Sequence, residues 1–254
     1  MRNIKLTIAY LGTAYKGWQK NNENSSIEAT LGSALERILH HPVTLQAASR
    51  TDAGVHAQGQ VVNMMTEHTM PLPLLQRALN GTLPKDISIL SLEEQPLSFH
   101  PTLDCIEKEY RYFLCNGSTQ LPFYHLTSWH VPHTLDRALM EKAASKFLGQ
   151  HDFSAFCNER SRWTRNPVCH LQSLHLIPID TERFYFQLIG DHFLYKMVRN
   201  LIGTIVDVGK GKLSVDNLPQ ILNNQQRHAA GVTAPAHGLS LYKVYYPGIY
   251  ELSK

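Results

Sequence analysis

The sequence is poor in cysteine and in long apolar runs, and each absence argues against a class of protein. Its 254 residues include four cysteines, at positions 105, 115, 157 and 169, and none of them belongs to a Cys-x-x-Cys pair. This number and spacing of cysteines argues against a disulfide-rich domain and against a structural zinc site. No apolar run reaches the ~18 residues that a membrane-spanning helix needs. Residues 1–6 fit a strand better than a secretory leader, so we expect reduced thiols and a cytoplasmic protein.

A strong excess of one charge is also missing. Lysine and arginine total 24 against 21 acidic residues, which gives a net charge of +3 with 14 histidines counted as neutral. This balance is compatible with an anionic partner but does not require one. Apolar residues make up 43% and charged residues 18%, which excludes global disorder and supports a sizeable core. The length fits one large domain or two closely packed ones.

Hydrophobic periodicity predicts an alternation of strands and helices. Alternating patterns predict strands at 4–10, 43–47, 60–65, 87–93, 109–115, 129–131, 184–189 and 239–246. Helical spacing predicts helices from a capping box at Ser25 and Glu28 to Leu39, at 72–80, from Thr134 to Gly149, and at 194–205. The halves follow a similar order, so we predict an α+β (mixed α/β) fold. Its two similar domains, 1–104 and 105–254, would have antiparallel or mixed sheets joined side by side, with helices on the outer face.

The polar loop 49–57 carries the most informative chemistry. Arg50 and Asp52 are two residues apart, so an extended loop places both side chains on one side. The cation would keep the carboxylate ionised, and Ala53 and Gly54 allow close approach of a ligand. Taken alone, however, the pattern favours an ordinary turn with a local ion pair.

Seven segments, in order, change that interpretation. They are Tyr10-x-Gly12 with Gly17-Trp18-Gln19, the loop Arg50–Ala57, Leu83-Pro84-x-Asp86-Ile87, Lys108-x-Tyr110-x-Tyr112, His151-Asp152-Phe153-x-x-Phe156, the run from Phe193 to Gly203, and Ala234-Pro235-Ala236-x-Gly238-Leu239-x-Leu241. Each is weak by itself. Together they span nearly the whole chain, which resembles the tRNA pseudouridine synthase A family.

The resemblance implies a function and a site. It implies a homodimer with an active-site cleft between its two domains. The expected reaction is conversion of uridine to pseudouridine at positions 38, 39 and 40 of the tRNA anticodon stem-loop. Asp52 corresponds to the catalytic aspartate, Tyr110 to the residue that stacks on the target base, and Arg199 to the partner of the aspartate. The isomerisation adds and removes no atoms, so we expect no cofactor and no metal. Three routes stay open for Asp52: it attacks the sugar, attacks the base, or removes a ribose proton.

Each of these residues also has a simpler interpretation. Tyr110 and Tyr112 share a strand face, where aromatic rings commonly pack in a core, although a stacking platform for an extruded base would use the same face. Arg199 lies off the apolar stripe of its helix, near Gly203. It is either a solvated arginine or part of a close-fitting functional face.

A basic set is the predicted RNA-binding surface. Arginines interleaved with an aromatic residue suit a phosphate backbone with unstacked bases, although a solvated face is equally compatible with the pattern. Its members are Arg50, Lys108, Arg160, Arg162, Arg165 and Lys196, with Tyr110 contacting the base and Trp163 lying among the arginines.

Two alternatives and three departures complete the prediction. A non-catalytic RNA-binding protein would not need Asp52, and a hydrolase would need a second acid that the loop lacks. A zinc site at Cys157, Cys169, His170 and His175 lacks the required spacing. The chain departs from the family pattern at Ser49, at Asn63 and over Thr102–Cys105, which concerns substrate positioning more than reaction class.

Overall fold

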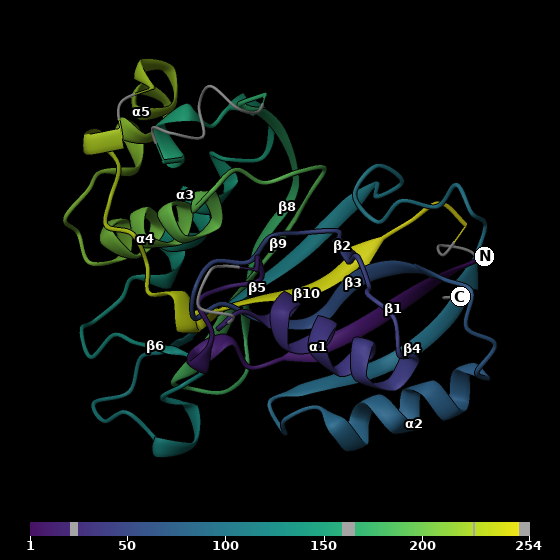
Figure 1. Ribbon diagram of the computed structural model, residues 1–254. Helices are drawn as coiled ribbons and strands as arrows, with labels where there is room; N and C mark the ends of the chain where they lie inside the picture. The colour runs from purple at the N-terminus through teal and green to yellow at the C-terminus, as the bar shows by residue number, and fades with distance from the viewer. Residues whose placement is uncertain (21–24, 159–165, 226, 249–254) are drawn as a thin grey trace. The chain divides into compact units, whose positions relative to one another are not determined.

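The computed structural model describes residues 1–20, 25–158, 166–225 and 227–248 (Figure 1). It divides into two compact units. Unit 1 comprises Met1–Ile106 and the chain from Ser240 onward, and unit 2 comprises Glu107–Leu239. Each unit combines helices with a mixed sheet, so the predicted α+β class is confirmed.

Unit 1 is built on a sheet in the order β4-β1-β3-β10. Its strands are β1 (Arg2–Tyr10), β2 (Gln46–Ala47), β3 (His56–Thr66), β4 (Ile87–Gln95) and β10 (Leu239–Tyr245). β1 pairs antiparallel with both β3 and β4, and the short β2 pairs antiparallel with β3. β10 pairs in parallel with the beginning of β3. The predicted domains, 1–104 and 105–254, differ from the units here, because β10 follows unit 2 in sequence yet pairs within unit 1.

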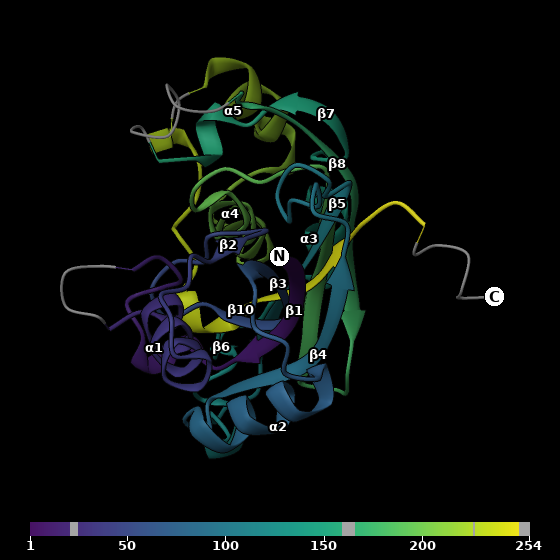
Figure 2. The ribbon, with the colours of Figure 1, turned by 45° about the vertical axis from the view of Figure 1, so that its right-hand side comes forward.

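Two helices, α1 (Ile27–Leu39) and α2 (Leu72–Thr82), lie side by side along the unit 1 sheet (Figures 1 and 2). Their apolar faces bury Leu31, Leu35 and Leu79, while β1 buries Ile4 and Leu6. This apolar layer fixes the strand ends from which the loops of the unit extend.

The cap of α1 was predicted one residue too early. The N-cap is Ser26, whose hydroxyl accepts a hydrogen bond from the Ala29 N–H. The capping box with Ser25 is wrong because the Glu28 carboxylate is engaged elsewhere, accepting from Lys20 N and Gln19 Nε2. The reciprocal bond of a capping box is therefore replaced by a bond to the preceding loop.

The strands of unit 2 follow the order β5-β9-β8-β7, with β6 paired in parallel to β5. The strands are β5 (Glu107–Cys115), β6 (Trp129–His130), β7 (Gly149–Asp152), β8 (Val168–Pro178) and β9 (Arg183–Gly190), and the helices are α3 (Arg137–Ser145), α4 (Met197–Gly209) and α5 (Leu218–Asn224). β7, β8 and α5 were not predicted. Short 3₁₀ turns lie at Gly12–Ala14, Pro122–Tyr124, Ser154–Phe156, Val215–Asn217, Arg227–Ala229 and Ala236–Gly238.

The predicted bounds of two unit 2 helices were wrong. α3 is capped by Asp136, which accepts from Leu139 N, and not by Thr134. α4 begins at Met197 because Lys196 has a left-handed φ of 63° and ends the turn that carries Leu194. Within the described residues, no helix is both long and apolar enough to cross a membrane.

Candidate active site

Asp52 lies in the loop between β2 and β3, half-buried, while Arg50 is exposed. Ala53 and Gly54 form a tight turn after it, which is closed by a 3.1 Å hydrogen bond from Val55 N to Asp52 O. Gly54 has a φ of 79°, a conformation that glycine adopts without strain. The loop therefore reverses direction just after its carboxylate.

The backbone on both sides of Asp52 is bonded to the segment that follows β1. Thr51 Oγ1 lies 2.7 Å from the Tyr10 hydroxyl, and Thr51 O accepts from Trp18 N at 3.0 Å. On the other side, Gly54 N donates to Tyr15 O at 3.3 Å. Asp52 is consequently held between two anchored residues, as a precisely placed reactive group requires.

Two glycines allow this close approach. Gly17 has a φ of 88°, and a Cβ there would lie 2.7 Å from Thr51 O. A Cβ on Gly12 would collide with the Val55 carbonyl. Gly12 N also donates to His56 Nδ1 at 2.9 Å, so the buried imidazole accepts at Nδ1 and carries no proton there. This bond makes His56 a support of the loop.

Asp86 supports the same segment from the turn before β4. Its carboxylate accepts from the Tyr15 hydroxyl at 2.7 Å, and its backbone oxygen accepts from Leu11 N at 2.9 Å. Burial, and then the bond to Asp86, raise the pKa of Tyr15, so the phenol remains a donor at neutral pH. Periodicity assigned no role to Asp86, because its partners are distant in sequence.

In unit 2, Tyr110 and Tyr112 share one face of β5, as the alternation predicts. Tyr110 is 6% exposed, and its ring meets Phe193 edge-on with centroids 5.0 Å apart. Tyr112 is fully buried and donates to Pro235 O at 2.8 Å. Burial raises the pKa of Tyr112, with the charge of Arg199 opposing the shift. Tyr112 is therefore a core residue, and Tyr110 is the slightly more exposed of the two.

Arg199 is half-buried in the first turn of α4. Its Nε donates to Ala234 O at 2.8 Å, and its backbone oxygen accepts from Ala234 N at 3.0 Å. A Cβ on Gly203, one turn further, would collide with Val232 O. The face that carries Arg199 is thus covered by residues 232–234, which disagrees with the interpretation of a solvated arginine.

The structure describes only some of the predicted basic residues. Lys108 is 7% exposed on β5, opposite Gly190. Lys196 precedes α4, and its ammonium lies 5.3 Å from the centroid of the Tyr195 ring. Arg160, Arg162 and Arg165 lie outside the described residues.

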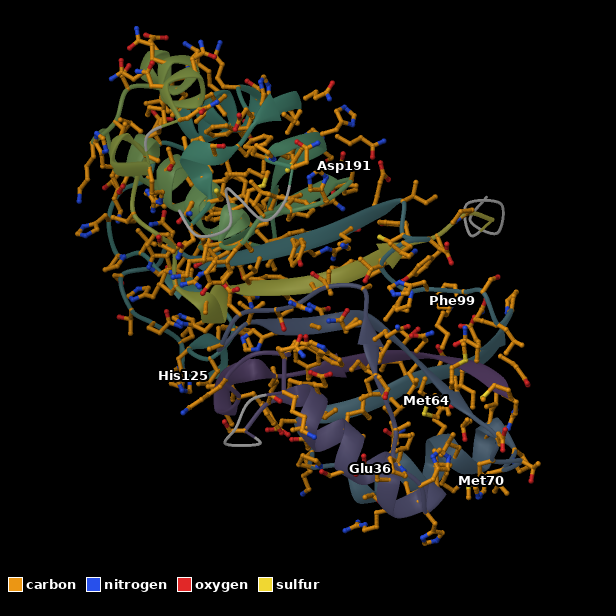
Figure 3. All side chains as sticks on the ribbon, turned by 45° about the horizontal axis from the view of Figure 1, so that its top comes forward. Glu36, Met64, Met70, Phe99, His125 and Asp191 are labelled. Atoms are coloured by element: carbon orange, nitrogen blue, oxygen red, sulfur yellow. The ribbon has the colours of Figure 1, made fainter. Side chains whose placement is uncertain are left out.

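The residues that depart from the family pattern are accommodated by local hydrogen bonds. Ser49 N and O both bond to the Gln60 side chain, and Asn63 Nδ2 donates to Asn3 Oδ1 at 2.9 Å. Thr102 Oγ1 donates to Ala47 O at 2.8 Å. Phe99, labelled in Figure 3, lies shortly before Thr102 in the chain, and the centroids of its ring and the Tyr246 ring are 5.3 Å apart. Each of these residues is therefore bonded to another residue of unit 1.

The cysteines and histidines considered for zinc do not converge. Cys169 is buried and the next residue of β8, His170, is exposed, since successive strand residues point to opposite faces. Cys169 Sγ instead lies 3.3 Å from His192 Nε2, and His192 Nδ1 lies 2.9 Å from Asp191, labelled in Figure 3. Burial, followed by Asp191, raises the pKa of the Cys169 thiol to about 12. Among the described residues, no three His, Cys, Asp or Glu side chains gather as a metal site would require.

Comparison with known proteins gives a consistent result. A family model described as tRNA pseudouridine synthase matches residues 6–104 and 143–247. A protein named tRNA pseudouridine synthase A 2, from Protochlamydia amoebophila, is 50% identical over 97% of this chain and 95% of its own length. A tRNA pseudouridine synthase A from Acetivibrio thermocellus is 42% identical over 97% of this chain and 100% of its own. A solved structure described as an H/ACA RNP bound to a substrate RNA containing 2'-deoxyuridine has a TM-score of only 0.39 at 12% identity, over 80% of this chain and 44% of that one.

Proposed function

This chain belongs to the tRNA pseudouridine synthase family, and we propose that Asp52 is the group through which it converts uridine to pseudouridine at positions 38, 39 and 40 of the tRNA anticodon stem-loop. The enzyme is an isomerase. The observation that carries the assignment of Asp52 is its position between Thr51 and Gly54, both of which are bonded to the segment after β1.

The reaction needs one ionised carboxylate. The bond from ribose C1′ to N1 of the base breaks, the base turns, and C1′ joins C5; C5 then loses its proton and N1 gains one. Asp52 begins this sequence by adding to the sugar or the base or by taking a ribose proton, and each route starts from the same charged oxygen. Burial of a carboxylate opposes ionisation, which a nearby cation offsets.

In this proposal, Arg199 is that cation and Tyr110 is the ring on which the target base stacks. The bond from Arg199 Nε to Ala234 O supports the first role, since it fixes the plane of the guanidinium. The contact of Tyr110 with Phe193 supports the second, since it holds the ring at one angle. Both residues contribute geometry that is set before substrate arrives.

In this proposal Arg50 and Lys196, with Arg160, Arg162 and Arg165, supply the cations for the RNA phosphates, and Lys108, at 7% exposure, is left out of that set. The enzyme acts as a homodimer in the cytoplasm. Support for tRNA as the substrate comes from the names of the two relatives, both of which are called tRNA pseudouridine synthases.

Tritium release tests the function. With tRNA labelled at uridine C5, the enzyme should release tritium in step with pseudouridine formation, because C5 loses its hydrogen after it bonds to C1′. A matched tRNA with cytidine at positions 38, 39 and 40 is the control and should release none. Binding without release would indicate an RNA-binding protein, and free uracil would indicate a hydrolase; either result would contradict the proposal.

A further inference from the structure

Residues 231–235 form an irregular segment that runs alongside α4 toward the start of β10 (Figure 1). The segment contacts Arg199 and Tyr112, since Ala234 O accepts from Arg199 and Pro235 O accepts from Tyr112. No strand or helix ladder holds it. Val232 and Thr233 are exposed, and Ala234 is its one fully buried side chain. Polar bonds therefore decide where it lies.

One face of α4 supplies part of these bonds. Gly231 N donates to Thr204 Oγ1 at 2.9 Å, and Val232 N donates to Asp207 Oδ2 at 3.1 Å. A Cβ on Gly231 would lie 2.7 Å from Thr204 Cα, so the backbone has no room for a side chain there. These contacts fix one register of residues 231–232 against α4.

Arg227 supplies the rest. Its Nη1 donates to Gly231 O at 2.8 Å, and its Nη2 donates to Asn200 Oδ1 and Thr233 Oγ1, each at 2.9 Å. Asn200 is 1% exposed and is itself anchored by a bond from its Nδ2 to Phe156 O at 2.7 Å. The guanidinium therefore joins a fixed point of α4 to two places on the segment, which only a planar group with several donors can do.

We propose that Arg227 is a positioning residue for the reaction: it holds residues 231–235 against α4 and, through Ala234, sets the orientation of the Arg199 guanidinium. Arg227 acts on Arg199 and does not touch the reacting nucleotide. This inference rests on the proposed role of Arg199 in catalysis. A small rotation of a group that must meet a developing charge lowers the rate far more than the binding of substrate.

The test compares Arg227→Gln and Arg227→Lys with wild type in three measurements: single-turnover pseudouridine formation, tRNA affinity and melting temperature. Arg227→Gln should slow the single-turnover step by about 10-fold to 100-fold while leaving tRNA affinity nearly unchanged. Arg227→Lys keeps the positive charge but lacks the planar set of donors of a guanidinium, so it should retain only part of the wild-type rate. Arg137→Gln is the matched control, since Arg137 also donates to a backbone oxygen of unit 2, that of Thr181, and should retain the full rate.

Coupling to Arg199 separates positioning from general stability. Arg199→Ala combined with Arg227→Gln should be no slower than Arg199→Ala alone, because the second change has nothing left to misplace. If Arg227→Gln does not fold, Thr233→Val removes one acceptor of the same guanidinium and should slow the step in the same way, to a smaller extent. Additive losses, or a full rate in folded Arg227→Gln or Thr233→Val, would overturn the proposal. A wild-type enzyme that forms no pseudouridine would instead overturn the proposed function.

Discussion

At Tyr110 the ring and the hydroxyl have separate chemical uses. The ring meets Phe193 edge-on and the residue is 6% exposed, and the proposed role of the ring is to stack on an extruded base. The hydroxyl is a donor and acceptor that a proton transfer from C5 would use. Substitutions at this one residue distinguish the two uses.

Tyr110→Phe retains the ring and Tyr110→Leu removes it. If stacking alone matters, the Phe variant should have nearly wild-type turnover and the Leu variant should lose it; if the hydroxyl takes the C5 proton, the Phe variant should bind RNA but release tritium slowly. Tyr185→Phe and Tyr185→Leu are the matched controls, because Tyr185 packs on Phe113 from the other face of the sheet. Full activity of both Tyr110 variants would return Tyr110 to simple core packing.

At the scale of the elements, α4 fits closely against residues 231–234. Gly203 is buried in the helix, where alanine would ordinarily be preferred by about 0.5–1 kcal/mol. Here the missing Cβ leaves space for the Val232 carbonyl, so glycine is required by the neighbouring backbone and not by its own conformation.

Gly203→Ala should therefore displace residues 232–234, destabilise the protein by ~1–3 kcal/mol as overpacking does, and lower turnover. Thermal unfolding and single-turnover rates measure the two effects. Gly32→Ala in α1 is the control: a Cβ there meets nothing within 4 Å, and the change should stabilise by up to ~1 kcal/mol without affecting turnover. Equal effects of the two substitutions would contradict the close contact at Gly203.

The elements also show why parts of the fold escaped prediction. In β8 the register shifts between Leu171 and Ser173, so the apolar period of two is interrupted and no strand was predicted from it. β1 was predicted because its apolar residues Ile4, Leu6, Ile8 and Tyr10 alternate in the sequence, although its pairing with β4 also shifts register between Thr7 and Ile8. For the site, the resemblance predicted Asp52, whereas the role proposed for Arg227 depends on bonds to Asn200 and to an irregular segment, which no periodicity indicates.

On the scale of the whole molecule, the net charge of +3 is small, so RNA binding must depend on where the cations lie. If Lys196 contacts a phosphate, Lys196→Gln should reduce the slope of log affinity against log salt by about one unit. Lys142→Gln on the exposed face of α3 is the control and should leave the slope unchanged. Equal slopes for wild type and Lys196→Gln would remove Lys196 from the RNA-binding surface.

The activity of the whole enzyme depends, in this account, on the charged oxygen of Asp52. Asp52→Asn removes that charge with almost no change in size, and the bonds of Thr51 and Gly54 to the segment after β1 do not involve the side chain. Pseudouridine formation in tRNA should be measured for Asp52→Asn beside wild type, with melting temperature and tRNA affinity as checks on folding and binding. We expect unchanged folding and binding with no pseudouridine at any pH; measurable pseudouridine from a preparation free of wild-type enzyme would contradict the central assignment.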